Sequence, residues 1–251
     1  MHIERVGFTP LKGARHRDQG AVELTAHGPV GDRLFCLFDP AADRCLRTVE
    51  NPALLRTEAT WRSGVLSVSL PSGTVEGTPA RTGETRKVDY WGRTAEIEVL
   101  DGPWAEAYSA HLGREVLLAR AKPGEVVYGG SVTLVTSASL ALLGERLGRP
   151  AAGARFRATL QVQTGDLPAH IEDDWVGRVL AVGPARLRVL GAVPRCAVID
   201  LDPESGVRDA PLMQVLAGYR RGVGEVTFGV DAEVVTPGRV ATGDRVELGE
   251  D

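Results

Sequence analysis

Cysteine is scarce in this chain of 251 residues, which contains only three. Such a small, odd number does not indicate a disulfide framework, so we expect reduced thiols and a cytoplasmic protein. Long apolar runs are missing too, because no window approaches the roughly 18 to 20 residues of a membrane span. The opening residues MHIERVGFTP hold an acid and no apolar stretch, unlike a signal peptide. These absences favour a soluble globular protein without membrane partners.

Lysine is almost as rare, so nearly all positive charge is arginine; the lysines are Lys12, Lys87 and Lys122. The formal net charge is -4, so no overall basic field would attract nucleic acid or anionic membrane. Any anion site must be built from local arginines, which bind phosphate bidentately and stay charged when partly buried. The arginine bias can equally reflect genome composition alone.

Short alternating runs between Gly, Pro and Asp turns dominate both ends of the chain. We expect strands over 2–8, 21–25, 33–38, 65–70, 87–91, 95–100, 156–163, 178–183, 185–190, 197–201, 225–230 and 244–248. Helical spacing predicts helices over 102–113, 137–148 and 211–222, with Gly113 ending the first and Ser137 capping the second. The sequence therefore predicts a mainly β (α+β) fold. We expect two β-barrel-like domains, residues 1–110 and 111–251, with short helices on the second.

Motifs of the common metal and nucleotide sites are missing from the sequence. It contains no CxxC, no HExxH and no Walker or GxGxxG loop, and YGGS at 128–131 is at most a weak anion loop. The Gly-rich stretch from about 120 to 130 is either a linker or a binding loop. Among five scattered histidines, only His16 in a charged loop remains a candidate. Ser137 is more typical of a helix cap than of a nucleophile.

The three cysteines occupy different surroundings. Cys36 and Cys45 lie in strand-like runs, where cysteine usually behaves as a small core hydrophobe. Cys196 follows Arg195 in PRCAVIDLDPESGVRD. A cationic neighbour lowers the pKa of a thiol from about 8.5, and the thiolate is the nucleophilic and metal-ligating form. On this local evidence Cys196 is either a metal ligand or a core residue.

Several segments, in the right order, resemble the MOSC domain, which is named for the C-terminal domain of molybdenum cofactor sulfurases. They are RFRATLQV (155–162), EDDWVGRVLAVGPARLRV (172–189), PRCAVIDLDPESGVRD (194–209) and FGVDAEVVTPGRVATGDRVEL (228–248). The first half resembles the β-barrel domain that precedes MOSC, through TPLKGARH (9–16), GDRLFCLFD (31–39) and LRTVENPALL (46–55). The whole arrangement is similar to the bacterial and mitochondrial amidoxime-reducing proteins.

This resemblance implies a molybdenum cofactor, molybdopterin, held at the seam of the two domains. Cys196 takes the place of the family's metal-ligating catalytic cysteine. By matching position, the cofactor-binding residues are Lys12, Arg33, Ser131, Arg157 and Arg195. The resemblance also associates the family, at family level only, with pyridoxal phosphate binding. We interpret the acidic turn with Asp202 and Asp209 as structural.

The implied activity is reduction of N-hydroxylated small molecules. The electrons would come from a separate flavin or Fe–S reductase, because the chain has no Fe–S cysteine cluster and no flavin fingerprint. One alternative is a sulfur carrier or transferase that holds a persulfide on Cys196. Another is a cofactor-binding protein without turnover. Three departures leave the substrate open: Gly13 replaces a family serine, Asp231 replaces a frequent aromatic, and FRAT (156–159) replaces FRPN.

Overall fold

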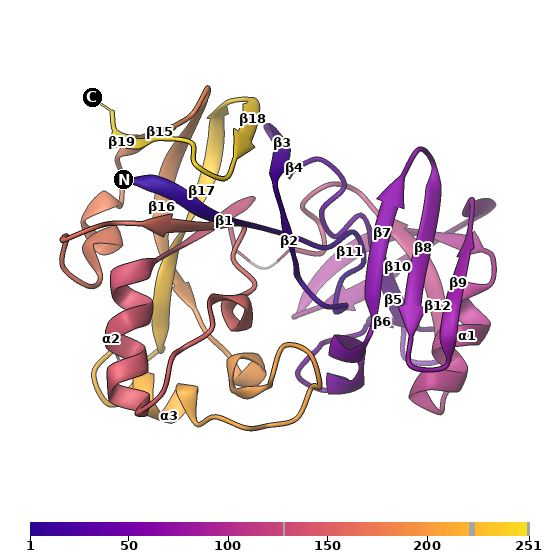
Figure 1. The fold of residues 1–251 in the computed structure, drawn as a ribbon. Helices are drawn as coiled ribbons and strands as arrows, with labels where there is room; N and C mark the ends of the chain where they lie inside the picture. The colour runs from indigo at the N-terminus through magenta and orange to yellow at the C-terminus, as the bar shows by residue number, and fades with distance from the viewer. Residues whose placement is uncertain (128, 221–223, 250–251) are drawn as a thin grey trace.

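The computed structural model describes residues 1–127, 129–220 and 224–249, and it is mainly β, as the sequence predicts (Figure 1). Its strands form a closed barrel, an eight-stranded sheet and two three-stranded sheets. Over these described ranges, no helix combines the length and apolar character that crossing a membrane requires.

The eight-stranded sheet carries the second half of the chain and has the order β19-β15-β16-β17-β13-β14-β1-β2. Its strands are β1 (His2–Phe8), β2 (Arg17–Gln19), β13 (Val132–Thr136), β14 (Leu160–Gln163), β15 (Val179–Val182), β16 (Ala185–Pro194), β17 (Thr227–Thr236) and β19 (Val246–Leu248). Alternate residues such as Leu134, Leu187 and Val230 are fully buried in one core. This alternation is why the sequence shows a period of two here.

The closed barrel has the order β10-β11-β12-β5-β6. It is made of β5 (Phe35–Asp39), β6 (Arg44–Cys45), β10 (Ala80–Tyr90), β11 (Arg93–Asp101) and β12 (Leu117–Ala121). Cys36 and Cys45 are buried in a core cluster of this barrel, with their sulfur atoms 3.9 Å apart. The prediction that both are core residues is therefore confirmed.

The remaining strands and the helices surround these two bodies. One small sheet joins β7 (Glu58–Arg62), β8 (Val65–Leu70) and β9 (Gly73–Gly77), and the other joins β3 (Ala21–Thr25), β4 (Gly28–Pro29) and β18 (Gly238–Ala241). The α-helices of the described residues are α1 (Trp104–Leu112), α2 (Ser137–Leu147) and α3 (Leu212–Ala217). The 3-10 helices are η1 (Pro52–Arg56), η2 (Gly153–Phe156), η3 (Ile171–Trp175) and η4 (Ala197–Asp200). Gly113 ends α1 in the left-handed conformation, as predicted.

Two strand pairs connect residues of the predicted domain 1–110 with residues of the predicted domain 111–251. Strand β1 pairs with β14, with Val6 opposite Leu160, and β3 pairs with β18. Strand β12 lies after residue 110 but completes the barrel. Pairing between strands far apart in the chain leaves no local pattern in the sequence, so these connections were not predicted. The division at residue 110 stays a prediction.

The start of α2 differs from the sequence prediction by one residue. Its N-cap is Thr136, not Ser137, because the Thr136 hydroxyl accepts a hydrogen bond from the Ser139 backbone N–H. The third predicted helix, 211–222, is observed only as α3 over 212–217, and residues 221 and 222 lie outside the described ranges.

Two predicted strands are also wrong in part. Residues 197–200 form η4, in which the neighbouring Ile199 and Asp200 are both buried, a pattern that strand alternation would not allow. The Asp200 carboxylate accepts the Met213 backbone N–H at 2.8 Å, which explains why an acid can be buried there. The strand expected over 156–163 begins only at residue 160, after η2 and a left-handed Arg157.

Candidate functional site

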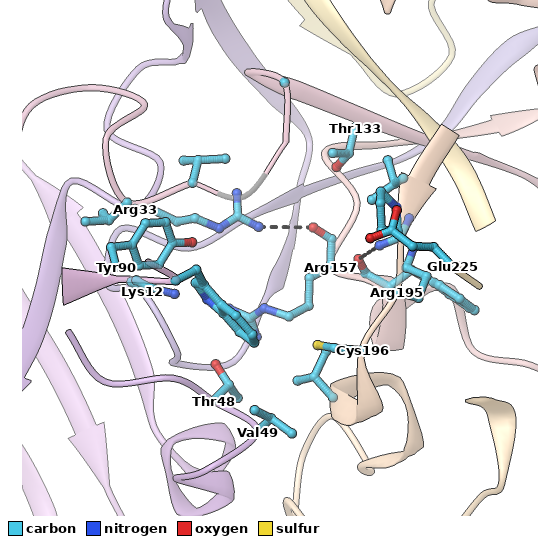
Figure 2. Close-up of a pocket in the computed structure, with 18 of the residues that line it drawn as sticks. Lys12, Arg33, Thr48, Val49, Tyr90, Thr133, Arg157, Arg195, Cys196 and Glu225 are labelled. Carbon is cyan, nitrogen blue, oxygen red and sulfur yellow. Dashed lines mark hydrogen bonds between the residues drawn. The ribbon is translucent and has the colours of Figure 1, made fainter. Parts of the chain in front are cut away.

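A cavity of about 410 Å³ lies where side chains from the barrel side and from the eight-stranded sheet meet. All six residues that the sequence predicts for the site line it: Lys12, Arg33, Ser131, Arg157, Arg195 and Cys196. Figure 2 shows Lys12, Arg33 and Tyr90 on one side and Arg195, Cys196 and Glu225 on the other. The two halves of the chain therefore each supply one wall.

Cys196 stands between the end of β16 and the start of η4. Pro194 is the last residue of β16, and Cys196 is the extended N-cap of η4, with φ -118°. Its side chain is half-buried, whereas Cys36 and Cys45 are fully buried in the barrel. Cys196 is therefore the cysteine that a molecule in the cavity could meet.

Arg195 is tied to the walls of the cavity through its guanidinium. Its Nε donates to the Phe228 carbonyl at 2.8 Å and its Nη1 donates to the Phe156 carbonyl at 3.1 Å. Burial lowers the pKa of Arg195 to about 10, and Cys196 and Asp231 oppose that shift. Its Nη2 is buried and has no hydrogen-bond partner within residues 1–127, 129–220 and 224–249. Arg195 thus holds β17 and η2 together and keeps one donor for a ligand.

Arg33 and Arg157 connect the two walls. Arg157 Nη2 donates to the Ala14 carbonyl at 2.9 Å, and Arg33 Nη2 donates to the Arg157 carbonyl at 3.1 Å. Arg33 also forms an ion pair with Asp32. Burial, and then the charge of Arg33, lower the pKa of Arg157 to about 9. Arg157 Nη1 is buried without a partner among the described residues, so it too is a donor that a ligand could satisfy.

Lys12 is the lysine of the cavity. Its backbone N–H donates to the Phe35 carbonyl at 2.8 Å, and its ammonium group lies 4.7 Å from the centre of the Tyr90 ring. Burial, helped by the charges of Arg157 and Arg33 and opposed by Cys45, lowers the pKa of Lys12 from 10.5 to about 8. Lys12 can therefore exchange a proton near neutral pH, which an exposed lysine cannot.

The lining is strongly cationic. Lys12, Arg33, Arg157 and Arg195 face one acid among the described lining residues, the exposed Glu225. Hydroxyl groups come from Thr48, Ser131, Thr133 and Thr159, and apolar walls come from Val49, Val126, Phe156, Val193, Val198, Met213 and Val226. This arrangement suits an anionic molecule with a flat or apolar part.

The Gly-rich stretch forms part of the cavity wall, because Val126, Val127 and Gly130 line the cavity. The Gly130 backbone N–H donates to the Asp231 carboxylate at 2.6 Å. Asp231, which stands where the family frequently has an aromatic, fixes this loop through that bond and is not a lining residue. Tyr128 of the YGGS motif lies outside the described residues.

The backbone conformation at residue 13 explains why glycine stands where the family has serine. Its φ is +94°, in the left-handed region, and a Cβ there would lie 2.7 Å from Leu54 Cδ1. A side chain at position 13 would point toward the core around Leu54. The missing hydroxyl therefore leaves the cavity lining unchanged.

His16, the histidine candidate of the sequence, does not line the cavity. It is buried, and burial together with the charge of Arg33 lowers its pKa well below the usual value, so it is neutral. No cluster of three or more His, Cys, Asp and Glu in the described part of the chain could hold a metal ion. A metal on Cys196 would thus need further ligands from a cofactor.

The acidic turn is structural, as predicted. Asp209 accepts two bonds from the Arg155 guanidinium, at 2.8 and 2.7 Å, and these bonds lower its pKa. Asp202 accepts the Ser205 backbone N–H at 2.8 Å, which lowers its pKa in the same way.

Sequence reasoning missed the aromatic residues of the cavity. Tyr90 and Trp91 line it from the barrel side, and Phe156 lines it from the sheet side. A signal for the first two was available, because YWGR (90–93) is a turn between two alternating runs with a large aromatic where turns prefer small residues.

Comparison with known proteins gives a family and three further likenesses. The family model described as MOSC domain matches residues 119–247. The molybdenum cofactor sulfurase of Solanum lycopersicum is 35% identical over 78 residues, which are 30% of this chain and 9% of that protein. The solved YuaD protein of Bacillus subtilis has a TM-score of 0.48 and 13% identity, covering 98% of this chain and 93% of that one. YiiM of Geobacillus stearothermophilus has a TM-score of 0.32 and 21% identity, covering 48% and 55%.

Proposed function

Because the chain belongs to the MOSC domain family, we propose that its cavity binds a molybdenum cofactor and that the protein reduces N-hydroxylated small molecules. The supporting observation is the meeting of four cationic side chains and one half-buried thiol, from both halves of the chain, in one cavity. Molybdopterin carries a phosphate and a polar ring system, and this lining offers donors with few carboxylates.

The residues present fit that cofactor. Buried guanidinium nitrogens without a partner are unfavourable, and Arg157 Nη1 and Arg195 Nη2 are two such atoms among the described residues. Phosphate or ring oxygens would satisfy both with charge-assisted hydrogen bonds. The sulfur of Cys196 would be a soft ligand suited to a metal of this kind. When bound, the cofactor would supply two-electron redox chemistry next to Cys196.

The chain's own groups would position the substrate and manage protons. Lys12, with its pKa near 8, can hold a proton at Nζ at neutral pH and release it to a nearby oxygen. The apolar wall of Val193, Val198 and Val226 would exclude water beside Cys196. We propose that electrons come from a separate reductase.

The decisive experiment is analysis of molybdenum and pterin in protein produced in a cofactor-competent host and isolated without oxygen. We expect both in the wild type and strongly reduced amounts of both in Arg157→Gln. The control is Arg62→Gln, because Arg62 is exposed on β7 and is not a lining residue. Wild-type protein without molybdenum and pterin would refute the proposal.

Cys196→Ser tests the proposed metal ligand. We expect reduction of N-hydroxylated substrates to be abolished, while the free energy of unfolding changes by about 1 kcal/mol or less, because the thiol is only half-buried. The control Cys45→Ser should be more destabilising, by roughly 1–3 kcal/mol, because it places a hydroxyl in the barrel core. Urea unfolding and a turnover assay measure the two effects. If Cys196→Ser does not fold, Cys196 is a core residue and not the proposed metal ligand.

A second candidate function is a sulfur carrier or transferase. It is favoured by the accessible Cys196 thiol and by the likeness to the molybdenum cofactor sulfurase, of which this chain spans only a small part. The Cys196 thiolate would attack the outer sulfur of the persulfide of a cysteine desulfurase, so that a new S–S bond forms on Cys196 and the desulfurase cysteine leaves as its thiolate. Intact mass should then rise by about 32 Da, one sulfur atom, on Cys196. Bound cofactor without turnover would instead indicate a binding protein.

A further inference from the structure

The hydroxyl of Tyr90 is a donor that the fold leaves unused. Tyr90 ends β10, where Val88 and Tyr90 alternate into the barrel core, and only 2% of its surface is exposed. A buried tyrosine hydroxyl usually has a hydrogen-bond partner. In the part of the chain that the structure describes, the Tyr90 hydroxyl has none, and Tyr90 lines the cavity. The hydroxyl is therefore free to bind a molecule inside the cavity.

Tyr108 shows how a hydroxyl with a structural role is treated in the same half of the chain. Tyr108 is also buried, and its hydroxyl donates to Thr57 Oγ1 at 2.9 Å. Tyr108 is not a lining residue of the cavity. Burying a hydroxyl without a partner costs free energy, so the contrast between the two tyrosines indicates that a ligand completes the bonding of Tyr90.

The charges around Tyr90 determine which acceptor suits it. The Lys12 ammonium lies 4.7 Å from the centre of the Tyr90 ring, and the Arg93 guanidinium lies 5.2 Å from it. Burial raises the pKa of Tyr90 to about 12, although the charges of Arg33 and Arg93 oppose this shift. The hydroxyl therefore keeps its proton at neutral pH and acts as a donor. Nearby cations favour a negatively charged acceptor, which is a carboxylate or phosphate oxygen.

Such an oxygen has two sources, the phosphate of the proposed cofactor and a carboxylate on the substrate. The phosphate has unpartnered donors of its own, Arg157 Nη1 and Arg195 Nη2, in the wall that also carries Cys196. Tyr90 stands in the opposite wall, with its oxygen directed toward the space between the two (Figure 2). The donor of Tyr90 is thus left for a second molecule.

We infer that the Tyr90 hydroxyl binds a carboxylate of the substrate, so that the cavity selects N-hydroxylated compounds that carry an acidic group. This inference rests on the proposed function. The cationic side chains beside Tyr90 would strengthen the binding of the carboxylate, whereas a neutral amide in its place would gain only a weaker hydrogen bond.

The test compares two N-hydroxybenzamidines with the same reacting group, one with a carboxylate on the ring and one with a carboxamide at the same position. Calorimetric titration of the anaerobically isolated protein, without a reductase, gives both dissociation constants. Wild-type protein should bind the carboxylate compound more tightly. The ratio of the two constants should fall about 10-fold in Tyr90→Phe, which keeps the ring beside Lys12 and removes only the hydroxyl.

Tyr108→Phe is the matched control, because it also removes one buried hydroxyl but lies outside the cavity lining. It should leave the ratio unchanged and lower the melting temperature, because the bond to Thr57 is lost. Tyr90→Phe should not lower the melting temperature. Molybdenum content should be the same in both variants as in the wild type.

Each contrary result is distinct. An unchanged ratio in Tyr90→Phe, or wild-type protein that does not prefer the carboxylate compound, overturns the inference. Loss of molybdenum in Tyr90→Phe but not in Tyr108→Phe also overturns it, because the hydroxyl would then bind the phosphate of the cofactor. If wild-type protein lacks molybdenum and pterin, the proposed function fails. A preference for the carboxylate that depends on Tyr90 would still support the binding role of Tyr90 in that case.

Discussion

Replacing Lys12 with methionine should stabilise the fold while removing cofactor. Burial lowers the pKa of Lys12 from 10.5 to about 8. This difference corresponds to roughly 3 kcal/mol, because one pKa unit is worth about 1.4 kcal/mol. The folded state therefore disfavours the charged lysine, and methionine keeps a similar length without the charge. We expect Lys12→Met to raise the free energy of unfolding at pH 7 by about 1–3 kcal/mol.

The pH dependence follows from the direction of that shift. Below pH 8 Lys12 is protonated in both states, so the wild type bears the full cost of the buried charge. Between pH 8 and 10.5 only the unfolded state remains protonated, so wild-type stability rises with pH relative to Lys12→Met. The advantage of the variant should therefore shrink across this window. Urea unfolding monitored by tryptophan fluorescence at several pH values measures it.

The matched control is Lys87→Met, because Lys87 is exposed on the same barrel, on β10. It should change the free energy of unfolding by less than about 0.5 kcal/mol. Molybdenum content should fall in Lys12→Met and not in Lys87→Met. A Lys12→Met protein that is no more stable than Lys87→Met at pH 7 would refute the reasoning about burial.

Two further predictions concern stability. Burial raises the pKa of Glu172 above 4.5, so wild-type stability falls as pH rises through that raised value. In urea unfolding at several pH values, Glu172→Gln should reduce this fall in the free energy of unfolding. The control Glu145→Gln, at an exposed position on α2, should not reduce it. Equal pH profiles for the two variants would contradict the role assigned to Glu172. Gly206→Ala should destabilise more than Gly64→Ala in thermal unfolding. Both glycines are left-handed, but a Cβ at Gly206 would clash with the Pro52 carbonyl while Gly64 faces open space. An equal loss of melting temperature in the two variants would mean that Pro52 moves away from the added Cβ at little cost in free energy.

The elements that the sequence predicts correctly are those whose limits depend on neighbouring residues. The spacing of Trp104 and Tyr108 and the final Gly113 located α1, because one buried face and a left-handed cap are set within a few residues. Strands such as β1 and β8 match their predicted ranges, because alternating burial is written directly in the sequence. The prediction that Cys196 and Lys12 belong to one site came from the order of the family motifs. The spacing of the two residues in the sequence did not indicate it.

What the sequence left out depends on contacts between distant residues. Nothing near Ile199 shows that Asp200 will be buried through Met213, so η4 looked like a strand. The role of Asp231 in fixing the Gly130 loop also required the fold. In both cases a polar side chain found its partner in another part of the chain.

The pairing of β1 with β14 governs the order of events during synthesis. The ribosome makes β1 first, and Leu160, the partner of Val6, emerges only much later. At about 5–20 residues per second, this strand waits on the order of ten seconds for its neighbour. Cys196 emerges later still, so the cavity has its complete lining only when translation is nearly finished. Loading of the proposed cofactor would therefore follow folding rather than assist its early stages.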